Sequence, residues 1–524
     1  MLNFRIRIPI KVYLRKQAVC SVVRYNLIPL GIAWVLTLLL AISSATALQQ
    51  TVQTGILGKG TDWQTSWSIR DSGKPGPVVL VVGGVHGNEP AGWLAAKQVA
   101  SWTIQRGKLI VLPAANRLGL KANTRWFPPQ RNNKALRDLN RNFPTQERSE
   151  AVTEIAVSIW DFVKKQKPDW VFDLHEGYDF HRINSKSVGS SVISFPAQKD
   201  FASQLVKRVN QNVVPEKHFS LLAGSGPVNG SLARACGQVL GSKSFIFETT
   251  TKDQPVSTRT RQHREMVSFA LEQLGVTDQK RVDQLVPKSD ASRSLVGVFD
   301  GPGASPKKLF NSLQFNPELT LAHIGVADIK ESIVRQFDVV IFPGGSGSKQ
   351  GRALGAAKRE LIRNYVETGG GVIGICAGAY LCSSHYDWSL HMMNAKVFNI
   401  NVDVPDVGRK SMWFRGPATN VQVDVFEKAR EKLGISGQHT VRYQNGPILS
   451  PGEHKTAPAY RVLAEFRTEN GIYDAQKGTM IGTPAVVEST YGKGAVMAFS
   501  PHFESTSGLE NVIAKAIQFV RKKP

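Results

Sequence analysis

The apolar run VVLVV at residues 78–82, followed by GGVHGNEP at residues 83–90, decides the fold of the first half of this 524-residue chain. Apolar residues in an unbroken run, ended by two glycines, are typical of a strand that is buried on both faces of a sheet. His86 and Glu89 follow that strand directly, three residues apart. An imidazole nitrogen and a carboxylate oxygen are ligands that suit Zn²⁺. The stretch therefore predicts an α/β sheet with a candidate metal site where one of its strands ends.

Strands and helices alternate on both sides of this stretch. Apolar strands are predicted at residues 77–82, 108–112, 170–174 and 244–247, and helices at 91–104, 149–165 and 200–212. A second pattern predicts strands at residues 295–299, 339–342 and 371–375 and a helix at 353–368. Such alternation is typical of a sheet covered by helices on both faces. The polar, aperiodic residues 277–293 predict a linker, so we expect two α/β domains, residues 48–276 and residues 294–524.

The first 47 residues have the pattern of a secretory signal peptide. Residues 1–24 hold six Lys or Arg and no acid, and an apolar run at 27–42 leads to Ala45 and Ala47. Small residues at these two positions predict cleavage after Ala47 and export, to the periplasm or the cell exterior. An uncleaved membrane anchor is the alternative, although its apolar run of about 16 residues is slightly short of a comfortable membrane span.

The charge of the chain favours anionic partners. Lys and Arg number 65 against 41 Asp and Glu, a formal net charge of +24. Part of the surplus belongs to the predicted signal, and part lies between Arg117 and Arg141, where Asp138 is the single acid. We expect this basic stretch to attract carboxylate-bearing substrates and the remaining surplus to allow contact with an anionic cell envelope. Basic helix motifs and RNA-binding aromatic strands are missing from the sequence, so a nucleic-acid partner is not expected.

Three further motifs extend the candidate metal site. His175 ends the apolar strand that starts at Trp170 and offers the third ligand that a catalytic zinc requires. Glu248 follows another apolar strand and suits the base that takes a proton from zinc-bound water. Asn140 and Arg141 form a pair that can grip a carboxylate, because the guanidinium fork is bidentate and the amide adds a donor.

The motifs HGNEP, DLNRNFP, DLHEG and FET, in this order, resemble those of the zinc carboxypeptidase superfamily, specifically its succinylglutamate desuccinylase and aspartoacylase branch, over about residues 50–275. The resemblance implies a mixed sheet with helices on both faces. It also implies that His86, Glu89 and His175 bind Zn²⁺ and that Glu248 serves as general base and acid.

The same resemblance assigns the substrate contacts. Asn140 and Arg141 match the pair that holds the free carboxylate of the substrate, and Arg125 occupies the place of the arginine that polarises the scissile carbonyl. The stretch between Arg125 and Asn140 is expanded, which leaves Arg131 or Arg137 as alternatives for that role.

A cysteine carries the candidate chemistry of the second half. Cys376 lies in the setting Gly-x-Cys-x-Gly between a strand and a helix, where small neighbours permit a sharp elbow that exposes a nucleophile. A helix N-terminus at this point favours the thiolate. Near the C-terminus, His502 could activate the thiol and Glu504 could orient the histidine.

This half resembles the class I glutamine amidotransferase superfamily, most closely the domain at the N-terminus of some biotin-protein ligases, over about residues 294–523. The resemblance implies a flavodoxin-like fold with Cys376 as nucleophile, His502 as base, Glu504 as its partner, and Gly344 and Gly345 near the oxyanion position. Export would remove the cytosolic glutamine supply, so a thiol hydrolase or a ligand-binding relic is as well favoured as glutamine hydrolysis. A purely structural Cys376, or a disulfide between Cys376 and Cys382, are further alternatives.

Together these observations predict an exported zinc-dependent amide hydrolase, of metallocarboxypeptidase or N-acyl amino acid deacylase type, acting on a small carboxylate-bearing amide or peptide. The appended domain has an uncertain activity. The predicted export disfavours cytosolic arginine catabolism and favours peptides or the stem peptides of a cell wall. The alternative is a non-catalytic cell-surface binding protein that uses both domains as ligand-recognition modules. The oligomeric state is not predicted.

Overall fold

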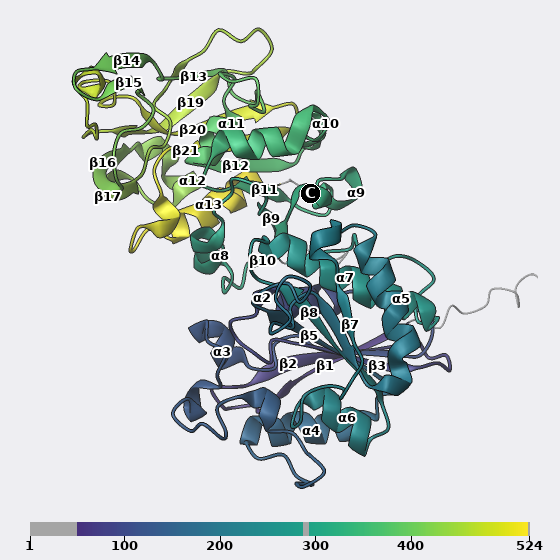
Figure 1. Ribbon diagram of the computed structural model, residues 1–524. Helices are drawn as coiled ribbons and strands as arrows, with labels where there is room; N and C mark the ends of the chain where they lie inside the picture. Colours follow the sequence, from purple (N-terminus) through teal and green to yellow (C-terminus); the bar gives the residue numbers. More distant parts are fainter. Residues whose placement is uncertain (1–49, 287–292, 522–524) are drawn as a thin grey trace, which may run out of the picture. The chain divides into compact units, whose positions relative to one another are not determined.

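The computed structural model describes residues 50–286 and 293–521, which contain two large sheets, each with its own helices (Figure 1). The predicted signal peptide, residues 1–47, lies outside the described residues, as do residues 287–292 of the predicted linker. Within the part that is described, none of the helices has the length and apolar character needed to cross a membrane.

The first sheet has eight strands in the order β1-β2-β4-β3-β5-β8-β6-β7. Its strands are β1 (Thr51–Leu57), β2 (Thr65–Asp71), β3 (Val78–Gly83), β4 (Lys108–Leu112), β5 (Trp170–Gly177), β6 (Ser191–Ser194), β7 (Ser220–Leu222) and β8 (Lys243–Thr250). The four central strands β4, β3, β5 and β8 are parallel. Antiparallel pairs join β1 to β2, β2 to β4 and β6 to β8, so the sheet is mixed.

Both faces of this sheet are buried. Alternate residues of β3 enter two different apolar layers: Val79 and Val81 one, Leu80 and Val82 the other. The helices of this half are α2 (Pro90–Val99), α3 (Arg117–Ala122), α4 (Glu154–Gln166), α5 (Lys199–Asn210), α6 (Leu232–Val239) and α7 (Val256–Gln273). Side chains of α2, α5 and α7 belong to the first layer, and those of α4 and α6 belong to the second. The unbroken apolar run at residues 78–82 is explained by this double burial.

The second sheet has nine strands in the order β10-β9-β11-β12-β21-β20-β19-β16-β17. Its parallel half consists of β9 (Ser294–Phe299), β10 (Leu319–Ile324), β11 (Val339–Phe342), β12 (Gly371–Ile375) and β21 (Gly494–Phe499). Its antiparallel half consists of β16 (Thr419–Val425), β17 (Gly437–Tyr443), β19 (Tyr460–Phe466) and β20 (Pro484–Tyr491). Two small ribbons pair β13 (Ala395–Val397) with β18 (Leu449–Pro451) and β14 (Asn401–Val404) with β15 (Gly408–Ser411).

The helices of the second half are mostly short. They are α8 (Lys307–Leu313), α9 (Glu331–Val334), α10 (Gly347–Glu367), α11 (Ala377–Cys382), α12 (Arg430–Leu433) and α13 (Asn511–Val520). Ile362 of α10 and Ile517 of α13 are fully buried and belong to two different apolar layers. This sheet too is covered by helices, so the predicted fold class, two α/β domains, is confirmed.

Several predicted boundaries differ from the structure. The predicted strands at 108–112, 339–342 and 371–375 agree with β4, β11 and β12. The predicted helix at 353–368 begins earlier, at Gly347, and contains a break at Gly355, whose φ of 67° and ψ of 172° are not helical. Apolar residues of the predicted linker, such as Val282 and Leu285, are buried.

Candidate metal centre and candidate thiol site

The three predicted metal ligands come from the ends of two neighbouring parallel strands. His86 and Glu89 lie in the turn between β3 and α2, and His175 lies in β5. Gly83 of β3 is paired with Leu174 of β5, which brings that turn beside His175. The parallel pairing thus gathers residues that are far apart in the sequence.

The three side chains converge on one point. Nδ1 of His86 lies 2.7 Å from one carboxylate oxygen of Glu89, and Nδ1 of His175 lies 3.0 Å from the other. The two Nδ1 atoms are 3.1 Å apart, and all three residues are buried. Two nitrogen ligands and a carboxylate that face one another at these distances fit the donor set of a catalytic Zn²⁺.

Two aspartates hold the far sides of the imidazoles. Nε2 of His86 lies 3.1 Å from Oδ1 of Asp138, and Nε2 of His175 lies 3.2 Å from Oδ1 of the fully buried Asp173. The contact between Asp138 and His86 is a hydrogen bond, whereas Asp173 and His175 meet only as an ion pair. In both cases the Nδ1 lone pair is left for a metal. Burial works against ionisation of Asp138, but His86 and Arg125 outweigh it and hold the pKa of that carboxyl below its usual range. In the same way Asp173 and Glu89 outweigh burial and raise the pKa of His175.

Glu176, the neighbour of His175, connects the strand to the helices around it. One of its carboxylate oxygens accepts a hydrogen bond of 2.6 Å from the backbone N–H of Ala91 at the start of α2, and the other pairs with Arg259 of α7. The backbone N–H of Glu176 donates to Glu89 at 3.1 Å. Glu176 therefore helps to hold the ligand Glu89 and the first turn of α2 in place.

Glu248 lies directly beside His175, because β5 and β8 are paired in parallel with these two residues in register. Burial, with a further contribution from the negative charge of Glu89, raises the pKa of Glu248 to about 8. Its Oε2 atom is buried and has no hydrogen-bond partner among the described residues. A carboxyl in this state is suited to accept a proton from water and return it later. A bound divalent cation would favour the ionised form.

Arg125 reaches the metal-ligand cluster. Its guanidinium lies 3.3 Å from Glu89 and 3.1 Å from Asp138, and its side chain is 34% exposed, so it stands at the solvent side of the cluster. Arg137 stacks over the ring of Trp126 instead, 4.2 Å from its centre, and Arg131 is exposed. Of the three candidate arginines, the structure brings Arg125 to the cluster.

Asn140 and Arg141 lie in the short 3₁₀ helix η2 (Leu139–Arg141), which follows Asp138 directly. The side-chain oxygen of Asn140 is buried without a hydrogen-bond partner in the described part of the chain. Arg141 is exposed and donates to the backbone carbonyl of Asn140 at 2.7 Å. Because Asp138 contacts His86, the structure places the predicted carboxylate-binding pair next to the metal ligands.

Cys376 occupies a strained elbow between β12 and α11. Its φ of 51° and ψ of −101° lie in a region that residues with a side chain rarely adopt. A Cβ atom at Gly378 would lie 1.9 Å from the carbonyl oxygen of Phe342, so only glycine lets the helix begin this close to β11. The predicted sharp turn with small neighbours is therefore present around the thiol.

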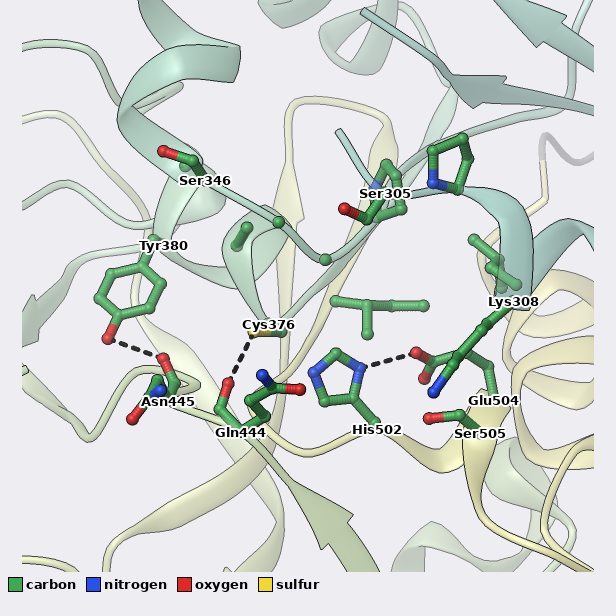
Figure 2. A pocket seen from close by; sticks show the side chains of 18 of the residues that line it. Ser305, Lys308, Ser346, Cys376, Tyr380, Gln444, Asn445, His502, Glu504 and Ser505 are labelled. Carbon is green, nitrogen blue, oxygen red and sulfur yellow. Dashed lines mark hydrogen bonds and ion pairs between the residues drawn. The ribbon is translucent and has the colours of Figure 1, made fainter. Parts of the chain in front are cut away.

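Two other predicted members of the thiol site, His502 and Glu504, lie in the same pocket as Cys376 (Figure 2). Nδ1 of His502 lies 2.7 Å from Glu504, and the imidazole lies between Glu504 and Cys376. A Cβ at Gly344 would lie 3.0 Å from Cε1 of His502 and 3.9 Å from Cβ of Cys376. Burial works against protonation of His502, but Cys376 and Glu504 together raise its pKa to about 10.

One alternative for Cys376 is wrong. Cys236, Cys376 and Cys382 are free thiols, so Cys376 and Cys382 do not form a disulfide. The two residues stand at opposite ends of α11, and the rise of the helix separates them.

Sequence reasoning gave no role to Asp138, Asp173 and Glu176, although each lies inside a quoted motif. In the sequence, Asp138 stands two residues before the polar pair Asn140 and Arg141. Asp173 stands two residues before the candidate ligand His175, and Glu176 follows it directly. The sequence did not show that these acids face the ligands, because the contacts depend on β5 and η2 lying beside the turn after β3.

The sheets and the two clusters define two α/β domains, the first with a candidate metal centre and the second with a candidate thiol site. Residues 75–214 match the family described as succinylglutamate desuccinylase/aspartoacylase catalytic domain, and residues 295–522 match the family described as biotin-protein ligase, N terminal. Both resemblances are confirmed. Glu248 lies beyond the first matched region.

Comparison with individual proteins gave distant similarities. The chain is 24% identical over 213 residues to cobyric acid synthase of Listeria monocytogenes, a match that covers 40% of this chain and 38% of that protein. The cell shape determinant Csd4 of Helicobacter pylori is 17% identical, with a TM-score of 0.35 over 48% of this chain and 66% of Csd4. An aspartoacylase family protein of Mesorhizobium loti is 24% identical, with a TM-score of 0.32 over 44% of this chain and 68% of that protein.

Proposed function

We propose that the first domain is a zinc-dependent amide hydrolase that acts on amides or peptides carrying a free carboxylate. The observation that supports this most directly is the convergence of His86, Glu89 and His175 on one point, with Glu248 beside them in the neighbouring strand. The matched deacylase family supports the same reaction type.

The proposed reaction uses groups of this chain at defined positions. A zinc ion held by His86, Glu89 and His175 would supply Lewis acidity and make bound water more acidic. Glu248 accepts a proton from the attacking water, whose oxygen bonds to the carbonyl carbon of the substrate. Glu248 then gives that proton to the leaving nitrogen as the C–N bond breaks. Arg125 donates hydrogen bonds to the carbonyl oxygen as negative charge develops there.

The substrate class follows from Asn140 and Arg141 and from the basic stretch that leads to them. An exposed guanidinium beside a buried amide suits a carboxylate that approaches from solvent. The predicted export would place this site outside the cytoplasm, where peptides are the carboxylate-bearing amides that fit the compartment. From the charge and motif pattern of the sequence we also propose that the protein contacts an anionic cell envelope and that it has no nucleic-acid partner.

The test compares the purified protein with its Glu248→Ala variant. Bound zinc is measured by elemental analysis, and hydrolysis is measured on a panel of N-acyl amino acids and peptides. We expect Glu248→Ala to retain zinc and to lose roughly 10²- to 10⁴-fold in kcat, because general acid–base catalysis contributes about that factor. Glu154→Ala, at an exposed position of α4, is the matched control and should retain full activity.

Equal hydrolysis by the wild type and Glu248→Ala would contradict the proposed mechanism. Zinc binding without hydrolysis of any substrate in the panel would instead favour a binding protein.

A further inference from the structure

A cavity of about 850 Å³ lies between the first and the second domain, which belong to one compact unit that begins at Gln50. This interdomain cavity shares only Pro306 and Lys307 with the cavity of about 900 Å³ that Cys376 lines. The metal ligands and Cys376 are not part of its lining, so it is a separate site. Its lining comes from residues 56–123 and 251–259 of the first domain and from residues 300–323 of the second.

Hydrogen bonds join the two domains at Asp300, which lines the interdomain cavity and is 6% exposed. The backbone N–H of Ser257, in the first turn of α7, donates to a carboxylate oxygen of Asp300 at 2.8 Å, and the hydroxyl of Ser257 donates to the backbone carbonyl of Asp300 at 2.6 Å. Nδ1 of His323 lies 3.3 Å from the same carboxylate oxygen. The charge of Asp300 is therefore committed to partners within the protein.

The other charges of this lining are positive. Asp300 is its single acid, against five basic residues. Arg259 is paired with the buried Glu176. Uncommitted cations around a cavity attract an anion. Four basic residues of the lining make no ion pair with any residue that the structure describes, namely Lys97, Arg117, Lys121 and Lys307.

The lining also offers apolar surface from both domains. Trp93 and Leu94 of α2 contribute to it from the first domain, and Phe310 and Phe315 from the second. Phe315 and Ile56 are 58% and 49% exposed, so a ligand can reach them. Aromatic rings supply large contact areas, and small-molecule sites are frequent at domain boundaries.

From these charges and apolar side chains we infer that the interdomain cavity binds a small amphipathic anion, with an aromatic or apolar body and one carboxylate or phosphate group. Arg117 and Lys121 stand four residues apart in α3, so their side chains share one face of the helix and pair with the acid group. The body of the ligand contacts the apolar side chains of both domains. Such a ligand stabilises the contact between the domains.

The test measures binding of two fluorescent probes to the purified full chain. One is the anion 8-anilinonaphthalene-1-sulfonate, and the other is N-phenyl-1-naphthylamine, which has the same rings without the sulfonate. We expect Arg117→Gln combined with Lys121→Gln to raise Kd for the anion about 5-fold or more, because hydrogen bonds to charged groups are lost, and to leave Kd for the neutral probe unchanged. Phe315→Ser should weaken both probes.

Lys308→Gln is the matched control, because this exposed lysine of α8 lines the cavity at Cys376 and not the interdomain cavity. It should bind both probes like the wild type. An equal loss of anion affinity in Lys308→Gln and in the double variant would place the probe at Cys376 and overturn the inference. Unchanged affinity in the double variant, or no binding by the wild type, would also overturn it.

Competition and hydrogen exchange identify the acid group and the position of the ligand. 1-Naphthoate and 1-naphthyl phosphate are compared as competitors of the anionic probe, and the tighter one identifies the preferred acid group. The better competitor should slow exchange in peptides from α3 and from residues 311–315, which lie on the two sides of the cavity, and not in peptides around Trp413. Failure of both competitors, or protection of only one side, would overturn the inference.

Discussion

His86 and His175 each use both ring nitrogens, one toward the metal-ligand cluster and the other toward an aspartate. His502 has a similar arrangement, with one nitrogen toward Glu504 and the other side of the ring toward Cys376. In each case a carboxylate faces the side of the imidazole that is turned away from the metal-ligand cluster or from the thiol, which favours one orientation of the ring. Both halves thus place a carboxylate beside each histidine of their candidate site.

Asp173→Asn should weaken zinc binding by about 10- to 100-fold, because the substitution removes the charge that orients His175 and makes it more basic. The dissociation constant is measured by competition with a chelator of known affinity. Asp161→Asn, at an exposed position of α4, is the control and should bind zinc like the wild type. An unchanged dissociation constant for Asp173→Asn would show that this aspartate does not support the ligand.

Alkylation of the native protein by iodoacetamide at pH 8 should modify Cys376 and leave Cys382 unmodified. Burial raises the pKa of Cys382 to about 12 and thereby favours its neutral thiol, so the thiolate is scarce at any pH well below that value. Cys376 lines the cavity beside His502. Mass spectrometry of the modified peptides measures both, and unfolded protein, in which all cysteines react, is the control. If iodoacetamide modified Cys382 as fast as Cys376, the burial of Cys382 would be contradicted.

At the scale of elements, glycines allow both sites to form where helices approach strands closely. A Cβ at Gly92 of α2 would lie 2.4 Å from the carbonyl oxygen of Leu174, next to His175. Gly378 has the same role between α11 and β11. The start of α2 therefore lies against Leu174, the neighbour of His175, and the start of α11 lies against Phe342 at the end of β11.

Gly92→Ala should destabilise the first domain by about 1–3 kcal/mol, because the added methyl forces α2 away from β5. The shift should also reduce zinc affinity, because Glu89 immediately precedes α2. Thermal unfolding and zinc titration measure the two effects. Gly224→Ala is the matched control, because a Cβ there meets no atom within 4 Å. If both variants unfolded and bound zinc alike, the close approach of α2 would not be essential.

The central parallel strands were predictable because burial on both faces gives continuous apolar runs, as in β3, β4 and β12. The antiparallel strands β16, β17, β19 and β20 were not. In the buried parts of β16 and β17, buried positions alternate with partly buried ones, so these strands lack the continuous apolar run by which the central strands were recognised. The start of α10 was also missed, because its glycines lower helix propensity.

At the scale of the whole molecule, the two candidate sites lie on different sheets. The metal ligands belong to the strands around β3 and β5, and the thiol follows β12 of the second sheet. A ligand that binds one site should therefore stabilise mainly the sheet that carries it.

Zinc at about 100 times its dissociation constant should stabilise the first domain by about 2.7 kcal/mol. Hydrogen exchange should slow in peptides from β5 and β8 and stay unchanged in peptides from β12. Removal of zinc by a chelator should reverse the effect without changing the alkylation rate of Cys376. Equal protection of both sheets by zinc would show instead that the two sites are energetically coupled.

The sequence by itself determined the two α/β halves and the residue types at both candidate sites, because strand-end motifs such as HGNEP and the Cys376 elbow are local patterns. Only the tertiary structure decided which groups meet. Arg125 rather than Arg131 or Arg137 contacts Glu89, Asp173 faces His175, and aromatic and basic residues from distant segments enclose Cys376. These contacts depend on strand order and on the register between strands, which neighbouring residues do not encode.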